Sequence, residues 1–245
     1  MKQTFFQFRQ FTIHQDKTAM KVCTDACLFG AWVCAQTPAD GRLTGLDIGT
    51  GTGLLSLMLA QERDMRMTAI EIDENACRQA AQNVAASPFA EKITVQQANA
   101  VGYQPAGKFD LIICNPPFFK DALQAATVNR NLARHETALP LSLLLEKGWE
   151  WLAPAGNFYL LMPFLRAAEL ETRAKERGYF IAEKLLVKQS ESHGFFRVMY
   201  ALTTAPAATS EEEITIRQAN GSYSSAFLQY LAPYYLPLHY LRNMK

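Results

Sequence analysis

The sequence predicts an α/β fold in which a mostly parallel sheet carries helices on both faces and includes an antiparallel hairpin near its C-terminal end. Short apolar runs alternate with longer helical stretches as far as residue 162, and this alternation is typical of parallel strands joined by crossover helices. Two further strand-like runs, at 181–188 and 195–203, are separated by a short polar segment that contains a glycine, which predicts the hairpin.

The boundaries of the expected elements follow from turn and capping residues, which interrupt the apolar runs along the chain. Before the hairpin we expect strands at 44–48, 66–72, 92–97, 109–114 and 157–162. We expect a first helix in 19–36, with Thr24 or Asp25 as its N-cap, and further helices at 54–60, 73–85, 141–152 and 166–177. A turn at Pro154-Ala155-Gly156 and a polar, basic insert between the fourth strand and residue 139 complete this division.

The composition bounds the domain organisation. With 245 residues, of which 49% are hydrophobic and 19% charged, the chain can form one domain with a large core. We expect a single domain over 1–245, with an N-terminal appendage to about residue 40, a core at about 41–205 and a helical tail at about 206–245. The tail carries aromatic residues at helical spacing, which favours core packing over a base-stacking surface: Tyr223, Phe227, Tyr230 and Tyr234.

Several classes of protein are disfavoured. No run of about 18 apolar residues predicts a membrane span, and the N-terminus lacks a signal-peptide pattern, so we expect a cytoplasmic protein. The five cysteines and four histidines show no zinc-ligand spacing, so we expect no metal. The net charge is only +1, so any nucleic-acid surface must be a local basic patch.

A glycine-rich turn at 47–53, with the sequence Asp-Ile-Gly-Thr-Gly-Thr-Gly, joins the first expected strand to a helix. Gly49, Gly51 and Gly53 let the backbone approach a ligand closely, and the helix N-terminus offers free N–H groups. The spacing is one residue short of the dinucleotide fingerprint, which disfavours an NAD dehydrogenase. A tight turn without any ligand is the alternative interpretation.

Glu71 ends the second expected strand, 18 residues after Gly53. A carboxylate at this place commonly binds the ribose hydroxyls of a nucleotide. A solvated acid at a helix start is the alternative, but Asp73 and Glu74 fit that description better, because Glu71 lies within an apolar alternation.

The fourth strand ends abruptly in Asn115, Pro116, Pro117 and Phe118. Prolines cannot donate to a sheet ladder, and the residue before a proline is held extended, so a stiff shelf should form at the carboxyl end of this strand. The Asn115 side-chain oxygen and the Pro116 carbonyl can each accept one hydrogen of an amino group, and Phe118 can stack on a planar ring. A turn that merely contains two prolines is the alternative.

These elements together resemble the class I AdoMet-dependent methyltransferases (AdoMet is S-adenosylmethionine). The resemblance covers about residues 19–203 and implies a seven-stranded, Rossmann-like sheet with one antiparallel hairpin strand. It implies that the glycine turn holds the methionine part of AdoMet, through Asp47, Gly49, Gly51 and Gly53. It further implies that Glu71 binds the ribose and that Asn99 meets the adenine, although most relatives carry Asp at that position.

The Asn-Pro-Pro-Phe motif resembles that of amino-methyltransferases, which modify adenine, guanine or glutamine nitrogens. The segments at 19–32 and 133–136 are similar to those of bacterial enzymes that methylate N6 of adenine 37 in tRNA(Val). In that group the N-terminal segment flanks the cofactor, so the resemblance implies that Lys21 and Thr24 contact AdoMet. A helix cap at Thr24 and a solvated charge at Lys21 remain open.

We therefore expect a monomeric tRNA (adenine-N6)-methyltransferase that acts on the anticodon loop. Residues 115–118 are the expected catalytic residues, and Phe118 would also stack on the target base. A local basic patch should contact the RNA backbone: Lys120, Arg130 and Arg134.

Other functions remain open. An rRNA guanine N2-methyltransferase shares the motif and the chemistry. Only the resemblances of the segments at 19–32 and 134–136 favour the tRNA adenine enzyme over it. A protein glutamine N5-methyltransferase usually carries a helical domain ahead of the glycine turn, whereas only 46 residues precede Asp47. An RNA-binding module with an inactive AdoMet fold is disfavoured by the intact set of Asp47, Glu71 and 115–118.

Overall fold

The computed structural model describes residues 4–18, 20–116 and 139–237. In chain order its elements are β1 (Phe5–Gln7), β2 (Thr12–His14), α1 (Thr24–Gln36), β3 (Leu43–Ile48), α2 (Leu54–Glu62), β4 (Met65–Glu71), α3 (Glu74–Ala85), η1 (Ala90–Lys92), β5 (Ile93–Gln97), β6 (Phe109–Cys114), α5 (Leu141–Trp151), β7 (Leu152–Pro163), η2 (Phe164–Arg166), α6 (Ala167–Arg177), β8 (Phe180–Ser190), β9 (Phe195–Thr203), β10 (Ser210–Arg217) and α7 (Ser225–Leu231).

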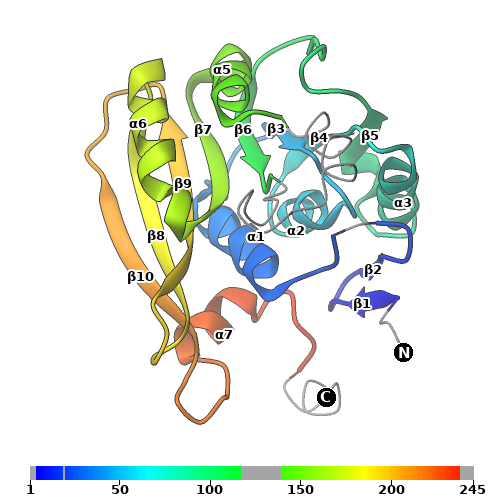
Figure 1. The fold of residues 1–245 in the computed structure, drawn as a ribbon. Coiled ribbons are helices and arrows are strands. Elements are labelled where there is room, and N and C mark those ends of the chain that lie inside the picture. Colours follow the sequence, from blue (N-terminus) through cyan, green and yellow to red (C-terminus); the bar gives the residue numbers. More distant parts are fainter. Residues whose placement is uncertain (1–3, 19, 117–138, 238–245) are drawn as a thin grey trace, which may run out of the picture.

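The main sheet confirms the expected fold class. Within the described residues it has eight strands in the order β10-β8-β9-β7-β6-β3-β4-β5, and β1 pairs with β2 in a separate antiparallel hairpin (Figure 1). The strands β7, β6, β3, β4 and β5 run parallel to one another, whereas β9 runs antiparallel to both β7 and β8. The hairpin expected at 181–188 and 195–203 is therefore present as β8 and β9.

Helices cover both faces of this sheet, and its central strands are therefore buried on both sides. Alternate residues of β6 belong to different cores: Leu111 and Ile113 lie in the core with α1, α2 and α7, whereas Ile112 and Cys114 lie in the core with α5 and α6. This period of two is what a strand between two helical layers requires.

The strand β10 is an eighth strand where the resemblance implied seven, and it lies within the tail that we expected to be helical. It pairs parallel with β8, and its buried Ile214 and Ile216 join the core. The sequence pattern did not predict this strand because its first half is acidic, and acidic residues are uncommon in strands. The structure compensates with cross-strand ion pairs of 3.0 Å, Lys184–Glu211 and Lys188–Glu213.

Two local expectations were wrong. The segment Pro154-Ala155-Gly156 lies inside β7, where the register against β6 shifts between Phe109 and Leu111 and Ala155 adopts φ 61°, so it is an irregularity in a strand and not a turn. In α1 the N-cap is Cys23, and no side chain caps the helix, so neither Thr24 nor Asp25 has the capping role. Asp25 instead pairs with Arg197 of β9 at 2.7 Å.

The described N-terminal segment and the described part of the C-terminal tail pack against each other. Phe8 stacks on Phe11 with ring centroids 4.6 Å apart, and the backbone N–H of Arg9 donates to the carbonyl of Tyr234 at 2.8 Å. In the tail, Phe227 and Tyr234 are buried, and Tyr223 and Tyr230 pack against the same core, which confirms the core-packing interpretation of that aromatic stripe. In the described part of the chain, no helix is long and apolar enough to cross a membrane.

The packing of α5 on β7 generates a stability prediction. A Cβ atom added at Gly148 would lie 2.4 Å from the Phe158 ring and 2.9 Å from the Tyr179 hydroxyl. Gly148→Ala should therefore lower the free energy of unfolding by about 1–3 kcal/mol through overpacking. Gly107→Ala is the matched control, because nothing lies within 4 Å of its added Cβ. Urea unfolding of both variants tests this, and equal stabilities would contradict it.

Candidate active site

The register of three neighbouring strands brings the expected site residues to one edge of the sheet. Ile48 of β3 pairs with Ile70 of β4 and with Cys114 of β6, so these strands end almost level. The residues that follow them therefore lie side by side at the carboxyl edge, where ligands bind in open α/β sheets.

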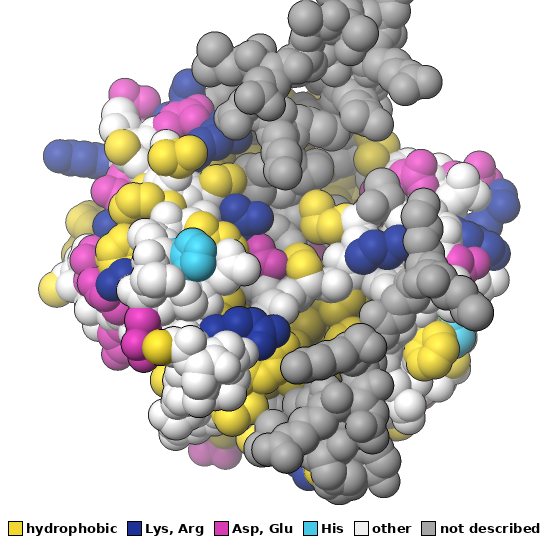
Figure 2. Space-filling model, turned by 60° about the horizontal axis from the view of Figure 1, so that its bottom comes forward, with side chains coloured by type: hydrophobic (Ala, Val, Ile, Leu, Met, Phe, Trp, Pro, Cys, Tyr) yellow, Lys and Arg dark blue, Asp and Glu magenta, His cyan; other side chains and the backbone are white. Residues whose placement is uncertain are grey.

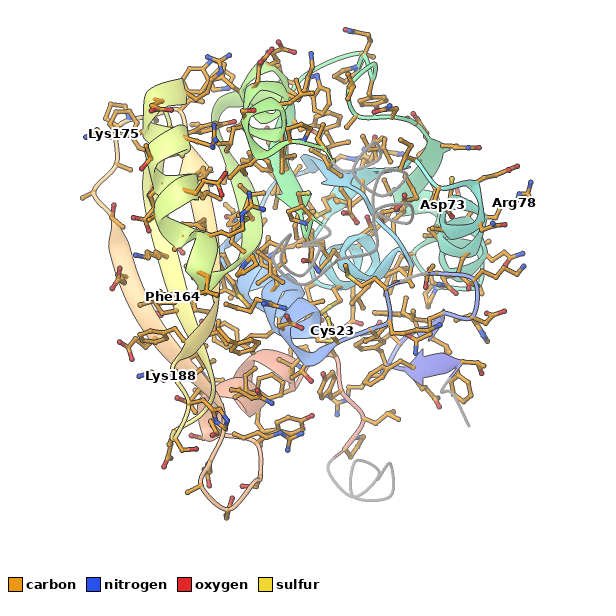
Figure 3. The ribbon with its side chains drawn as sticks, in the orientation of Figure 1. Cys23, Asp73, Arg78, Phe164, Lys175 and Lys188 are labelled. Carbon is orange, nitrogen blue, oxygen red and sulfur yellow. The ribbon has the colours of Figure 1, made fainter. Side chains whose placement is uncertain are left out.

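A cavity of about 450 Å³ opens at this edge. Its lining comes from the N-terminal segment before α1, from the glycine turn, from the start of α3, from the chain after β5 and from the end of β6. Figure 3 labels Asp73, which lines the cavity at the start of α3, and Cys23, which lies beside the lining residue Val22 just before α1. Most of the lining surface is contributed by apolar groups, including Ile72, Ala98, Ala100 and Leu144.

The glycine turn lies on one side of the cavity with its backbone accessible. Gly49 and Gly51 have φ of 72° and 58°, a left-handed conformation that favours glycine, and a Cβ added at either would meet no atom within 4 Å. The N–H groups of Gly49 and Thr50 donate to the Ile70 carbonyl at 2.9 and 3.1 Å, which ties the turn to the end of β4. The backbone is thus shaped to admit a ligand without side-chain obstruction.

Glu71 lies where the sequence predicts, in the lining of the cavity and only 9% exposed. Its Oε2 accepts from the N–H of Gly51 at 2.9 Å, and its Oε1 accepts from the N–H of Asp73 at 3.0 Å. Each carboxylate oxygen retains a further lone pair. Glu71 can therefore receive hydroxyl donors from a ligand while its own orientation is fixed by the backbone.

Asp47 is buried beneath the turn, and neither it nor Gly53 is among the described residues that line the cavity. Its Oδ2 accepts from the Thr50 hydroxyl at 2.7 Å and from the Ser56 hydroxyl at 2.8 Å. Burial raises the pKa of this carboxyl to about 6, although both hydroxyls lower it. In the structure Asp47 orders the turn from below.

Of the three remaining residues that we expected to contact the cofactor, two line the cavity and one does not. Asn99 lines the cavity, and its side-chain oxygen accepts from the N–H of Val101 at 2.9 Å. Lys21 also lines the cavity; it is an exposed residue whose ammonium donates to the Gln15 carbonyl. Thr24 is the first residue of α1 and is not among the described lining residues.

At the shelf, Asn115 and Pro116 line the cavity, and the Asn115 amide lies 4.0 Å from the sulfur of Met20. The other expected catalytic and RNA-binding residues lie outside the described residues: Pro117, Phe118, Lys120, Arg130 and Arg134. Among the residues that the structure describes, no three His, Cys, Asp or Glu side chains are grouped to hold a metal ion.

Sequence reasoning missed part of the N-terminal wall of the cavity. Lys17, Thr18 and Met20 line it together with Lys21. They lie in an irregular connection after β2, where neither helical nor strand periodicity gives a signal. The contacts that hold this segment come from α3, far away in the sequence.

The fold and the site together define a class I AdoMet-dependent methyltransferase. The profile of the family described as "Methyltransferase small domain" matches residues 33–152. A solved Geobacter sulfurreducens SAM-dependent methyltransferase, in complex with S-adenosyl-L-homocysteine, has this fold with a TM-score of 0.54 at 14% identity, covering 76% of this chain and 94% of its own. A predicted O-methyltransferase from Agrobacterium tumefaciens has a TM-score of 0.64 at 15% identity, covering 84% and 95%.

Curated relatives specify the family more closely. A Parabacteroides distasonis protein named tRNA1(Val) (adenine(37)-N6)-methyltransferase is 39% identical, covering 97% of this chain and all of its own. A protein of the same name from Tolumonas auensis is 37% identical, covering 94% and 96%. This chain belongs to the family of these tRNA1(Val) (adenine(37)-N6)-methyltransferases.

The buried carboxyl of Asp47 generates a pH prediction. Because its pKa is raised from 3.8 to about 6 in the folded protein, protonation of Asp47 favours the fold. This contribution is complete below about pH 4 and is lost as the pH rises through about 6, with a size on the order of 3 kcal/mol. Relative to Asp47→Asn, the wild type should lose stability over that window. Urea unfolding at several pH values measures this, and a pH-independent difference would contradict it.

Proposed function

We propose that this protein transfers a methyl group from AdoMet to the exocyclic N6 of an adenine in tRNA, namely adenine 37 of tRNA(Val). One observation carries the proposal: the strand register brings a glycine turn with a ribose-type carboxylate and the start of an Asn-Pro-Pro motif into the same cavity. Membership of the family whose relatives carry this activity in their names supports the choice of substrate.

The cofactor would lie along the glycine turn. Glu71 would accept hydrogen bonds from the ribose hydroxyls, while the apolar lining near Ala98 and Leu144 would receive the adenine beside Asn99. Bound AdoMet supplies an electrophilic methyl group on a sulfonium centre. The protein's task is then to orient the nucleophile, and positioning of this kind can supply much of a rate enhancement.

The nucleophile would be held by the shelf. An exocyclic adenine nitrogen is a poor nucleophile, because its lone pair is delocalised into the ring. Hydrogen bonds from its two hydrogens to the Asn115 side-chain oxygen and the Pro116 carbonyl would favour a pyramidal nitrogen with an available lone pair. The expected stacking of Phe118 on the base remains a sequence-based prediction. An unpaired loop base needs little unstacking energy to reach this position.

The binding of tRNA would require cationic groups near the cavity. On the face shown in Figure 2, the Lys and Arg side chains of the described residues are scattered and form no continuous basic band. Lys120, Arg130 and Arg134, which follow the shelf in the sequence, are therefore our candidates for phosphate contacts in the anticodon-loop region. We further propose that the protein acts as a monomer in the cytoplasm.

Nucleoside mass spectrometry of total tRNA from cells with and without this protein tests the activity. We expect N6-methyladenosine at position 37 of tRNA(Val) only when the protein is present. Purified protein with AdoMet should restore the modification on tRNA from the deficient cells. Methylation of guanine in rRNA, with tRNA unchanged, would overturn the proposal in favour of the guanine N2 alternative.

The role of Glu71 predicts a loss of cofactor affinity. Glu71→Gln removes the charge; its one oxygen can still accept from the Gly51 N–H and so keep the turn, while the bond from the Asp73 N–H is lost. Charge-assisted bonds contribute about 1.5–3 kcal/mol, so AdoMet should bind roughly 10- to 100-fold more weakly. Glu74→Gln, at a largely exposed acid in the first turn of α3, is the control. Calorimetry that gives both variants wild-type affinity would remove Glu71 from the site.

The role of Asn115 predicts a loss of turnover. Asn115→Ala removes an acceptor whose bond strengthens as the target nitrogen becomes pyramidal, so the single-turnover rate should fall by about 10-fold or more. Asn115→Asp keeps an acceptor oxygen and should retain more activity than Asn115→Ala. AdoMet affinity should remain near that of the wild type in both. Normal single-turnover methylation by Asn115→Ala would exclude the shelf from the chemistry.

A further inference from the structure

The inner face of α3 carries two amide side chains that are almost completely buried. Gln79 is 2% exposed and Asn83 is 1% exposed, and they lie one helical turn apart. Buried amides are retained where their hydrogen bonds are satisfied, because an unpaired one costs free energy. Both point their polar groups at main chain outside α3.

Asn83 joins two parts of the molecule that are distant in the sequence. Its side-chain oxygen accepts from the N–H of His14 at 2.9 Å, and its amide nitrogen donates to the His14 carbonyl at 2.9 Å. The same nitrogen donates to the carbonyl of Thr52 in the glycine turn, also at 2.9 Å. The end of β2 and the glycine turn are thus held by one side chain.

Gln79 extends this contact along the N-terminal chain. Its side-chain oxygen accepts from the N–H of Lys17 at 2.9 Å, so α3 holds the backbone both at His14 and at Lys17. The Gln15 side chain then accepts from the N–H of Val22 at 2.8 Å, which brings the two ends of the connection together. Figure 1 shows this connection passing from β2, beside α3, to α1.

The segment held in this way forms one wall of the cavity. Lys17, Thr18, Met20, Lys21 and Val22 all line it, and the Met20 sulfur lies 4.0 Å from the Asn115 amide at the start of the shelf. By contrast, neither Gln79 nor Asn83 is among the described lining residues. Their influence on a ligand must therefore pass through the backbone that they hold.

We propose that Asn83 and Gln79 are positioning residues of the cofactor site, which hold the N-terminal segment as a fixed wall and couple it to the glycine turn. The inference rests on the cofactor site described above, since it assigns that site its positioning residues. Asn83 is the coupling residue, because it alone among the described side chains bonds both to residue 14 and to residue 52. Gln79 contributes a single bond at Lys17.

The test compares Asn83→Ala and Gln79→Ala with Gln82→Ala, an exposed amide on the same helix. Calorimetry with S-adenosyl-L-homocysteine measures affinity without any need for turnover. We expect roughly 10-fold weaker binding for Asn83→Ala, a smaller loss for Gln79→Ala and wild-type binding for Gln82→Ala. In folded Asn83→Ala the KM for AdoMet should rise by more than kcat falls, because this side chain holds the cofactor wall and is not part of the shelf.

Limited trypsin digestion supplies a readout that global destabilisation does not mimic. In Asn83→Ala and Gln79→Ala a released N-terminal segment should be cut faster at Lys17 and Lys21 than at other sites. S-adenosyl-L-homocysteine should slow this cleavage. Digestion conditions are chosen at which the wild type remains intact.

The outcomes separate this inference from the proposed function. Wild-type S-adenosyl-L-homocysteine affinity and wild-type cleavage in Gln79→Ala and in folded Asn83→Ala would overturn the positioning role. If Asn83→Ala fails to fold, the result with Gln79→Ala decides. A wild-type protein that binds S-adenosyl-L-homocysteine but leaves tRNA unmodified would overturn the proposed RNA activity and leave the positioning role standing.

Discussion

The register of the parallel strands β3, β4 and β6 is the constraint on which the site depends. Ile48, Ile70 and Cys114 lie level, so the glycine turn, Glu71 and Asn115 emerge together. A slip of one residue in the register would move every side chain of a strand to the opposite face of the sheet. In β3 it would turn Asp47 away from the hydroxyls that it bonds. Because these strands are buried on both faces, such a slip is expensive, and the hydrophobic cores therefore set the geometry of the chemistry.

The turn itself depends on charges that point inward. Asp47 holds Thr50 and Ser56 from below, and Glu71 holds the Gly51 N–H from the cavity side. Burial raises the pKa of Asp47, which shows that ordering the turn carries a cost in stability near neutral pH. The two carboxylates thus have different tasks: one shapes the backbone, and the other also faces the ligand.

Local patterns in the sequence were sufficient for much of this arrangement. The apolar run before Asn115 and the glycine spacing after Asp47 predict a strand end and a ligand-binding turn, because each depends on neighbours in the chain. The position of Asp47 beneath the turn, the start of α1 without a side-chain cap and the strand β10 could not be predicted in this way. Burial of Asp47 depends on α2 lying above it, and β10 depends on lysines of β8 that offset its acidic residues.

The N-terminal wall shows why the rest required a structure. Neither a helical nor a strand period marks residues 15–22 in the sequence, and amides more than sixty residues away on α3 hold the backbone at His14 and Lys17. The same end of the chain is also tied to the tail, where Arg9 bonds to the backbone of Ala232 and Tyr234. A cofactor wall without regular structure can be rigid only if partners fix its backbone from outside. Here those partners are the buried amides of Asn83 and Gln79, which bond to the backbone at His14 and Lys17.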